Sequence, residues 1–475
     1  MKSNLRKNYL YNLAYQIFSL LAPLLTTPYV ARVLKADGVG LYSYTYSIAT
    51  AFVALAQLGT VIYGQREIAY HKEDRQARSE IFWNIAVLRL CTVLMSSVLY
   101  FCIFCFGKYA DMFRIQMLCI IAVAFDISWF YQGIEEFGKV ALRDILSKVV
   151  SITCVFLLVK TQKDVGLYSF ILAAAIIGGR IVNWVSLPKY VSRVRLKTLR
   201  PLKGMHVILM LFIPQIASQL YTVIDKSMIG MMTTTTFESG YYAQADRIIK
   251  LCMAVLTSIV TVIMPRIAQA HAQSNPQEIQ RYMKKTYRFI WMMGLPMMLG
   301  LICVIHHIIP WFLGEGYGQV GSLVLIFSVQ ILLMGLSNAT GTYLVAIERQ
   351  KTYAFSMAAG ALFNILLNAI LIPRMLATGA AIASVAAETL ILGIELYAVR
   401  REFCLMDILK ESVVYLPAAA GMTAVLLLIR PRFSANIPGT FALIAIGGGL
   451  YFALLLLYRE PFFLENLKRV VRKRA

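Results

Sequence analysis

Apolar blocks of about twenty residues recur from one end of the chain to the other, separated by short polar segments. In a helix, about 20 apolar residues cross the roughly 30 Å hydrocarbon layer of a membrane. Of the 475 residues, 59% are hydrophobic and only 15% are charged, a balance that no soluble core of this size requires. The pattern therefore predicts an all-α polytopic membrane protein.

The blocks predict about fourteen transmembrane helices, counted by the length that one crossing needs. They cover residues 10–30, 39–62, 82–106, 112–133, 145–161, 164–187, 206–230, 238–264, 287–310, 319–346, 353–373, 376–399, 411–429 and 438–458. The loops between them are short, so we expect no separate catalytic domain outside the membrane.

Lysine and arginine residues gather in alternate loops. Roughly 32 of them fall on one side of the predicted membrane and about 9 on the other, and the richer side is normally cytoplasmic. Both chain ends are therefore expected in the cytoplasm. The same bias accounts for the net charge of +22, so the basic excess indicates contact with anionic membrane lipid and not with nucleic acid.

An internal repeat links the two halves of the chain. The segment that starts at Gly40 matches the segment that starts at Gly240, and residues 132–135 match residues 345–348 further on. Because the matches occur in the same order, they predict two six-helix lobes in a parallel pseudo-repeat, followed by two extra helices. The predicted parts are an N-terminal lobe at 1–203, a C-terminal lobe at 204–402, and helices 13 and 14 with a basic cytoplasmic tail at 403–475.

Ionisable residues inside the predicted helices are the strongest functional signal, because each costs roughly 2.5–3.5 kcal/mol at membrane depth on insertion scales. Asp246, Arg247 and Lys250 lie together on one helix, with Lys250 one turn from the other two. The repeat aligns them with an uncharged polar stripe of the second helix, which predicts a cavity with one cationic and one hydroxyl-rich wall. The alternative is an internal salt bridge between Asp246 and Lys250.

Two other helices of the second half carry pairs of ionisable residues. Asp225 and Lys226 are adjacent, so their side chains point roughly 100° apart and they are not expected to be simply each other's partners. Glu388 and Glu395 lie two helical turns apart and could carry a coupling proton or ion. For Glu395, near the helix end, packing against a loop arginine is the preferred interpretation.

In the first half, Arg89, Asp126 and Arg180 are the charged residues within the predicted helices. Gly178 and Gly179 are expected to let another helix approach closely beside Arg180. Pairing of Asp126 with one of the two arginines for structure alone is an equal alternative to a role in substrate binding.

Motifs of catalytic or metal sites do not occur in the sequence. It has no hydrolase elbow, no Walker loop, no pair of catalytic carboxylates and no HExxH. Cys102 and Cys105 form a CxxC, but they lie in an apolar helix without a second pair or a nearby histidine, so no metal site is expected. The chain is predicted not to be an enzyme and to need no cofactor, while coupling to protons or sodium ions stays open.

Four segments resemble the polysaccharide-biosynthesis flippases. They are TTPYVARVLKADGVGLYSYTYSI (Thr26 to Ile48), LGTVIYGQREIA (Leu58 to Ala69), FDISWFYQGIEEF (Phe125 to Phe137) and IPQIASQLYTVIDKSMIG (Ile213 to Gly230). This family exports lipid-linked oligosaccharides and shares a superfamily with the lipid II flippases and the multidrug and toxin extrusion transporters. The resemblance covers nearly the whole chain.

The resemblance implies two lobes around a cation-lined cavity in the bacterial cytoplasmic (inner) membrane, with the last two helices forming a groove for a lipid tail. It implies that an undecaprenyl-pyrophosphate-linked oligosaccharide moves from the cytoplasmic to the outer leaflet by alternating access, for lipopolysaccharide or capsule assembly. Contact with the polysaccharide polymerase machinery would follow.

Arginine and lysine side chains would hold the phosphates of such a substrate. The expected substrate-binding residues are Arg247, Lys250, Lys226, Arg89 and Arg180. The expected charge-tuning or ion-coupling residues are Asp225, Asp246, Asp126 and Glu388. Arg66, in the family-like YGQREIA segment, is expected to form a cytoplasmic gate.

Two alternative functions stay open. A multidrug or cation antiporter of the same superfamily should have a cavity dominated by carboxylates, whereas arginine and lysine residues are at least as numerous as acidic residues in the predicted helices. A membrane-embedded glycan polymerase, an enzyme, should carry a long external loop with paired ionisable residues, and the sequence has no such loop.

Overall fold

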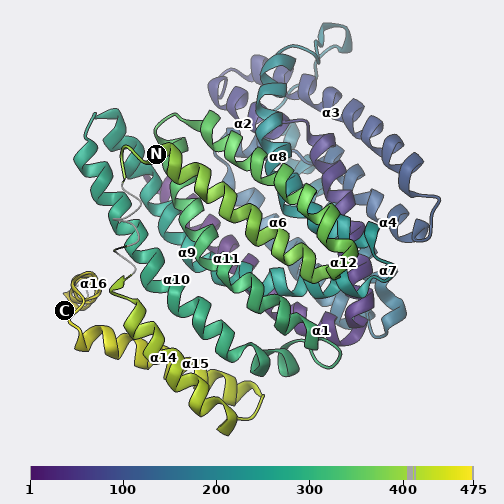
Figure 1. The fold of residues 1–475 in the computed structure, drawn as a ribbon. Coiled ribbons are helices and arrows are strands. Elements are labelled where there is room, and N and C mark those ends of the chain that lie inside the picture. The colour runs from purple at the N-terminus through teal and green to yellow at the C-terminus, as the bar shows by residue number, and fades with distance from the viewer. Residues whose placement is uncertain (1, 404–409, 411–412, 473–475) are drawn as a thin grey trace. The chain divides into compact units, whose positions relative to one another are not determined.

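The computed structural model describes residues 2–403, 410 and 413–472, and these form helices joined by turns, without a strand (Figure 1). The main helices of the first half are α1 (Lys2–Gln57), α2 (Thr60–Tyr70), α3 (Arg75–Phe104), α4 (Ala110–Ile121), α5 (Ser128–Gly133), α6 (Phe137–Leu158), α7 (Val165–Ser186) and α8 (Met205–Met232). Those of the second half are α9 (Phe237–Ala272), α10 (Pro276–Phe312), α11 (Gly318–Ala346), α12 (Gln350–Val399), α14 (Leu416–Ile429), α15 (Ile437–Leu457) and α16 (Pro461–Arg472). The end of the predicted basic tail, residues 473–475, lies outside the described residues.

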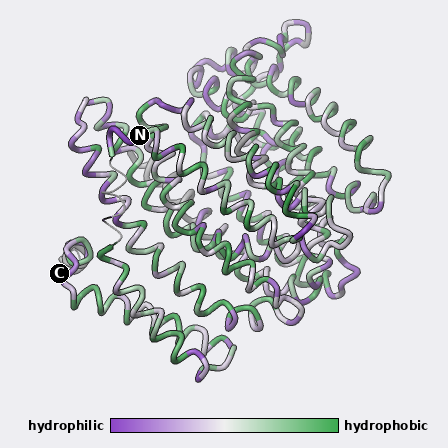
Figure 2. Tube along the Cα trace, viewed as in Figure 1, coloured by the Kyte–Doolittle hydropathy of each residue, from purple (hydrophilic) through white to green (hydrophobic). Residues whose placement is uncertain are grey.

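Within the described part of the chain, nine helices are long and apolar enough to cross a membrane. Figure 2 shows that hydrophobic residues dominate most helices, while hydrophilic residues gather at many of the connections. Two of the apolar stretches, Leu21–Tyr70 and Gln350–Val399, run for 50 residues each, which is more than one crossing requires. The prediction of an all-α multi-pass membrane protein is confirmed.

The two longest helices each contain one break in helical geometry. In α1 the break is at Lys35, with φ of 58°, and in α12 it is at Leu376, with φ of 54°. Positive φ is uncommon outside glycine, because the side chain then crowds the backbone carbonyl. Close to both positions the sequence predicts that one helix ends and the next begins. The breaks therefore divide each long element as the hydropathy pattern predicts.

The chain forms two compact units, Met1–Gly240 and Tyr241–Ala475. In the first unit, α1 packs against α3, α4, α6 and α8. Ile48, Tyr100 and Phe113 belong to one of its buried apolar clusters. Helix α8 follows the predicted lobe boundary at residue 203, and because it packs on α1 it belongs to the first unit.

In the second unit, α11 lies between α10 and α12 and contacts both. Tyr287, Ile290 and Leu336 are among the buried residues that fill this part of the unit. Helices α14 and α15 lie side by side and pack on α10 (Figure 1). These two helices thus join the second unit through one shared face of α10.

One turn supports the internal repeat. Glu135 follows α5 with φ of 65°, and Glu348 follows α11 with φ of 62°. The next N–H closes the turn in both places, from Glu136 to the carbonyl of Tyr131 and from Arg349 to that of Leu344, each at 2.8 Å. This is the left-handed helix ending that normally selects glycine. Its recurrence with glutamate at both aligned positions is difficult to attribute to chance.

Candidate functional site

The helix predicted at residues 112–133 is broken in the middle, and this is a correction to the sequence analysis. Helix α4 ends at Ile121, and α5 begins at Ser128, with Asp126 extended between them (ψ of 101°). The Asp126 carboxylate accepts hydrogen bonds from the backbone N–H of Ser128 at 3.0 Å and from its hydroxyl at 2.6 Å. The carboxylate therefore satisfies the first N–H of α5 through a local turn, which stabilises the break.

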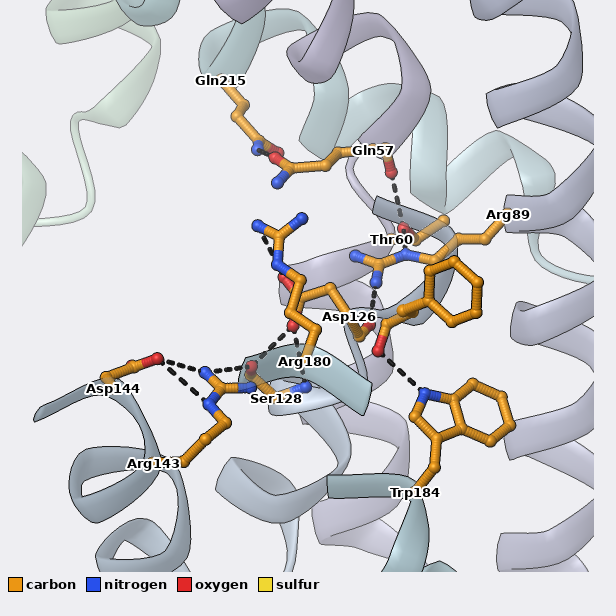
Figure 3. A network of polar contacts seen from close by, with 11 residues as sticks. Gln57, Thr60, Arg89, Asp126, Ser128, Arg143, Asp144, Arg180, Trp184 and Gln215 are labelled. Carbon is orange, nitrogen blue, oxygen red and sulfur yellow. Dashed lines mark hydrogen bonds and ion pairs between the residues drawn. The ribbon is translucent and has the colours of Figure 1, made fainter. Parts of the chain in front are cut away.

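The break leaves two carbonyl groups outside the helical ladder, and side chains from other helices satisfy them (Figure 3). The Trp184 indole N–H donates to the carbonyl of Phe125 at 2.9 Å, and the Arg89 guanidinium donates to the carbonyl of Asp126. Irregular backbone at membrane depth is tolerated only where such partners exist. Arg89 and Trp184 thus hold the broken helix in place.

Arg89 is itself tightly enclosed, with 1% of its surface exposed. Its Nε donates to the hydroxyl of Thr60 at 2.8 Å, and its guanidinium lies 5.9 Å from the centroid of the Trp129 ring. Gly64 leaves room for that ring, because a Cβ at Gly64 would come within 2.4 Å of Trp129. Helices α2 and α5 therefore fix the position of the Arg89 charge.

Two further arginines meet the same break. Arg180 of α7 places a guanidinium nitrogen 3.6 Å from the Asp126 carboxylate. Arg143 of α6 is 9% exposed and donates to Asp144 at 2.5 Å and to the hydroxyl of Ser128 at 3.3 Å. Figure 3 shows the three guanidinium groups arriving from different helices around Asp126. We call this set the arginine cluster, made of Arg89, Arg143 and Arg180 with Asp126 and Asp144.

The arginine cluster has more positive charge than its own acids neutralise, since three guanidinium groups face two carboxylates and leave a formal charge of +1. One nitrogen of each arginine is buried and has no acceptor among the described residues: Nη2 of Arg89, Nη1 of Arg143 and Nη1 of Arg180. Buried N–H groups are nearly always paired in folded proteins. Three such donors in one place are suited to an anion with several oxygens.

Amide groups lie next to the cluster. Gln215 of α8 donates to the amide oxygen of Gln57 at 3.2 Å, and its own amide oxygen is buried without a donor among the described residues. In Figure 3 the guanidinium of Arg180 points toward this pair. The site therefore offers acceptors beside its cations.

In the second unit, the Lys250 ammonium lies 2.8 Å from the Asp246 carboxylate, one helical turn away. The Lys250 side chain is 51% exposed in spite of this pairing. Arg247, between them in sequence, is half-buried. The salt bridge that the sequence offered as an alternative is therefore present, and it leaves Lys250 accessible.

Comparison with known proteins decides the family. The family model "Polysaccharide biosynthesis protein" matches residues 5–271, more than half of the chain. The chain belongs to this family. A second family model, MatE, matches residues 211–370.

Relatives and solved structures agree with that assignment. The Escherichia coli (strain K12) "Putative O-antigen transporter" is 24% identical over 84% of this chain and 97% of its own length. The Haloferax volcanii "Probable low-salt glycan biosynthesis flippase Agl15" is 21% identical over 36% of each chain. The structure of the lipid II flippase MurJ, in an inward closed conformation, matches with a TM-score of 0.73 and 19% identity, over 95% of this chain and 99% of that one.

An inward-facing multidrug resistance MATE transporter matches with a TM-score of 0.58 and 14% identity, over 82% of this chain and 98% of that one. The chain thus shares the fold of both groups of transporters. Its named relatives are transporters and flippases, not enzymes.

The two glutamates of α12, Glu388 and Glu395, are buried. Glu395 has 0% exposure, and its two oxygens accept hydrogen bonds from the hydroxyls of Ser337 at 2.9 Å and Ser356 at 3.1 Å. The loop residue Arg349 pairs with Glu402 instead, at 2.9 Å. The expectation that Glu395 packs against a loop arginine is therefore wrong. Glu388, two turns earlier, is also buried.

The remaining predicted site residues lie on α8 and α2. Asp225 is buried and Lys226 half-buried on α8, and the next residue, Ser227, meets Ser47 of α1 at 2.8 Å. Arg66 is exposed, pairs with Glu67 at 3.0 Å and lies over the Tyr63 ring. Among the described residues, no three His, Cys, Asp or Glu side chains form a metal-binding group.

The prediction that Gly178 and Gly179 let another helix approach closely is right for one of the two glycines. A Cβ at Gly179 would lie 3.0 Å from Ser147, so this glycine does allow α6 to approach α7. A Cβ at Gly178 would meet no atom within 4 Å, so this glycine borders open space.

Arg143 and Asp144 are the two members of the arginine cluster that the sequence did not predict. Arg143 was counted as a loop residue because its predicted helix begins at residue 145, whereas α6 begins at Phe137. A signal was present: Arg143, Ser147 and Ser151 recur every four residues, and Cys154 follows three later. That spacing places all four on one face of a helix.

Proposed function

We propose that this protein is a flippase for a lipid-linked glycan. Its substrate would be an undecaprenyl-pyrophosphate-linked oligosaccharide, which it moves from the cytoplasmic to the outer leaflet by alternating access, for lipopolysaccharide or capsule assembly. The protein would lie in the bacterial cytoplasmic membrane with both termini inside. The names of its relatives and the fold it shares with the lipid II flippase support this class of activity.

The observation that carries the proposal is the arginine cluster. A pyrophosphate has several oxygens that accept hydrogen bonds, and guanidinium groups bind such oxygens in pairs. Arg89, Arg143 and Arg180 offer three buried donors without an acceptor among the described residues. Arg89 and Arg180 lie in helices that are apolar enough to cross a membrane, where a charge is costly unless a ligand or a partner uses it. An anionic lipid headgroup is the ligand that fits both the charge and the location.

The other predicted residues take supporting roles in this proposal. Arg247 and Lys250 of α9 would contact the phosphate or sugar headgroup, with Lys226 as a further cation. Asp225, Asp246 and Asp126 would tune these cations, Glu388 would carry a coupling ion, and Arg66 would act at a cytoplasmic gate. The division into lobes at 1–203, 204–402 and 403–475, and contact with a polysaccharide polymerase, belong to the same proposal.

A cation antiporter is less compatible with the charge balance. Its binding site should present carboxylates to an organic cation, but the carboxylate of Asp126 faces Arg180 and that of Asp144 faces Arg143. Neither acid is therefore left to bind a cationic drug.

The experiment that tests the proposal locates the lipid-linked repeat unit in cells that lack the protein. A membrane-impermeant lectin or glycosidase is applied to spheroplasts and to inverted vesicles, which distinguishes the two leaflets. We expect the repeat units to accumulate on the cytoplasmic leaflet and to return outside when the wild-type gene is restored. Unpolymerised units already on the outer leaflet would overturn the proposal and indicate a polymerase.

A further inference from the structure

A groove runs along the surface of the first unit between α6 and α7. It encloses about 500 Å³, and its walls are mainly apolar, including Leu146, Val150, Phe170 and Val182. Helix α7 lies in one of the segments apolar enough to cross a membrane. The groove is therefore open toward a surface that lipid chains can reach.

Small residues of α7 create the room in this groove. Ala174, Ala175, Gly178 and Gly179 follow one another at helical spacing along its wall. A Cβ at Gly178 would touch nothing within 4 Å, whereas one at Gly179 would press on Ser147. Gly179 thus sets the distance between the two helices, and Gly178 keeps the groove open.

Arg143 is the one charged residue among those that line the groove. It is nine-tenths buried, and its Nη1 has no acceptor among the described residues. Its other terminal nitrogen reaches Ser128, which also donates to Asp126 in the arginine cluster. Arg143 therefore links the lining of the apolar groove to the rest of the arginine cluster through Ser128.

We infer that the groove between α6 and α7 binds part of the polyprenyl chain of the transported lipid, with a phosphate of that lipid at Arg143. An ordinary phospholipid chain could also fill an apolar groove, but the connection from Arg143 to the arginine cluster favours the lipid that the cluster binds. This inference rests on the proposed function, and it assigns the lipid part of the substrate to a surface of the first unit.

The test fills the groove without disturbing the helix packing. Gly178→Leu adds a side chain where no neighbour lies within 4 Å, and leucine favours a helix more than glycine does. Gly393→Leu is the matched control, since Gly393 also has open space around its Cβ and lines another apolar hollow, on α12, that contains no charged residue. Each full-length variant is purified in detergent, and its binding of undecaprenyl phosphate is titrated by native mass spectrometry.

We expect Gly178→Leu to weaken undecaprenyl phosphate binding by roughly tenfold, while Gly393→Leu binds like the wild type. The same variant should reduce glycan export in cells. Equal binding by the two variants would overturn the groove assignment, and export by Gly178→Leu at the wild-type level would then leave the proposed function standing. Phosphatidylglycerol binding is measured in the same way. If Gly178→Leu weakens the binding of phosphatidylglycerol but not that of undecaprenyl phosphate, the groove is a phospholipid site and the assignment is also overturned. If cells lacking the protein still export the glycan, the proposed function itself fails, whatever the binding result.

Discussion

Arg89 and Asp126 are joined through the main chain and not through their opposite charges. The Arg89 guanidinium donates to the carbonyl oxygen of Asp126, while the Asp126 carboxylate faces Arg180 at 3.6 Å. The two arginines therefore have different tasks. Arg89 stabilises the broken helix between α4 and α5, and Arg180 supplies the charge that neutralises the carboxylate.

Replacing Arg89 should reduce stability. In Arg89→Gln the shorter side chain cannot reach both the Asp126 carbonyl and the Thr60 hydroxyl, so buried polar groups lose partners, at a cost of about 2–4 kcal/mol. Thermal unfolding of the purified protein in detergent measures the loss. Lys72→Gln, which removes an exposed salt bridge to Glu135, is the control and should change the stability by less than about 1 kcal/mol. A melting temperature of Arg89→Gln equal to that of the control would contradict this assignment.

Arg180 should matter for export more than for stability. Arg180→Lys keeps the charge opposite Asp126 but loses the planar pair of donors that a phosphate uses, so we expect export to fall by about tenfold with unchanged protein level. The double variant Asp126→Asn with Arg180→Gln removes both charges, and the asparagine oxygen can still accept from the Ser128 N–H. If the pair serves structure alone, this neutral double variant exports normally. We expect it to fold and not to export, as measured by surface glycan against membrane protein level.

The helical blocks could be predicted because crossing a membrane demands long apolar runs, and the breaks at Lys35 and Leu376 fall where those runs are interrupted. The break at Asp126 could not be found in this way. Apolar residues surround Asp126 on both sides, so hydropathy continues across it. The break depends on donors from α3 and α7, which come from distant parts of the sequence.

Part of the candidate site could be predicted from the same hydropathy pattern. Arg89, Asp126 and Arg180 were recognisable because a charge within an apolar block is unusual, and the structure brings them together. Their division of tasks was not predictable, because it depends on whether a guanidinium meets a carbonyl or a carboxylate. Arg143 was missed because it lies at the polar edge of its block.

Charges on α9 give the third prediction. Arg247→Gln with Lys250→Gln should abolish surface glycan while the protein level in the membrane stays intact, because the proposed headgroup contacts of the second unit are then lost. The Asp246→Asn and Lys250→Gln double variant removes both partners of the salt bridge and keeps Arg247, so its protein level in the membrane shows whether the pair is needed for folding. Wild-type glycan output from the Arg247→Gln and Lys250→Gln double variant would contradict the assignment of these two residues to substrate binding.

Gly40 and Gly240, which the internal repeat aligns, approach each other closely in the structure. A Cβ at Gly40 would lie 1.7 Å from the carbonyl oxygen of Thr236, and one at Gly240 would lie 2.2 Å from that of Ala36. Because backbone atoms cannot turn aside as side chains can, Gly40→Ala should destabilise the protein by about 3 kcal/mol or more. Gly448→Ala, where a Cβ meets nothing within 4 Å, is the control and should not lower the melting temperature. If Gly40→Ala and Gly448→Ala have equal melting temperatures, the close approach of Gly40 to the Thr236 carbonyl does not form.

Glu395 allows a test of how a buried carboxyl is tolerated. Glutamine has nearly the same shape, and serine hydroxyls can both donate and accept, so Glu395→Gln can keep its contacts with Ser337 and Ser356. We expect Glu395→Gln to lower the free energy of unfolding by less than about 1 kcal/mol. Glu395→Ala leaves both hydroxyls unpaired beside a cavity and should lower it by about 2–4 kcal/mol. Thermal unfolding compares the two variants. If Glu395→Gln is as unstable as Glu395→Ala, the negative charge itself is required, and a cation must face this carboxylate in the working protein.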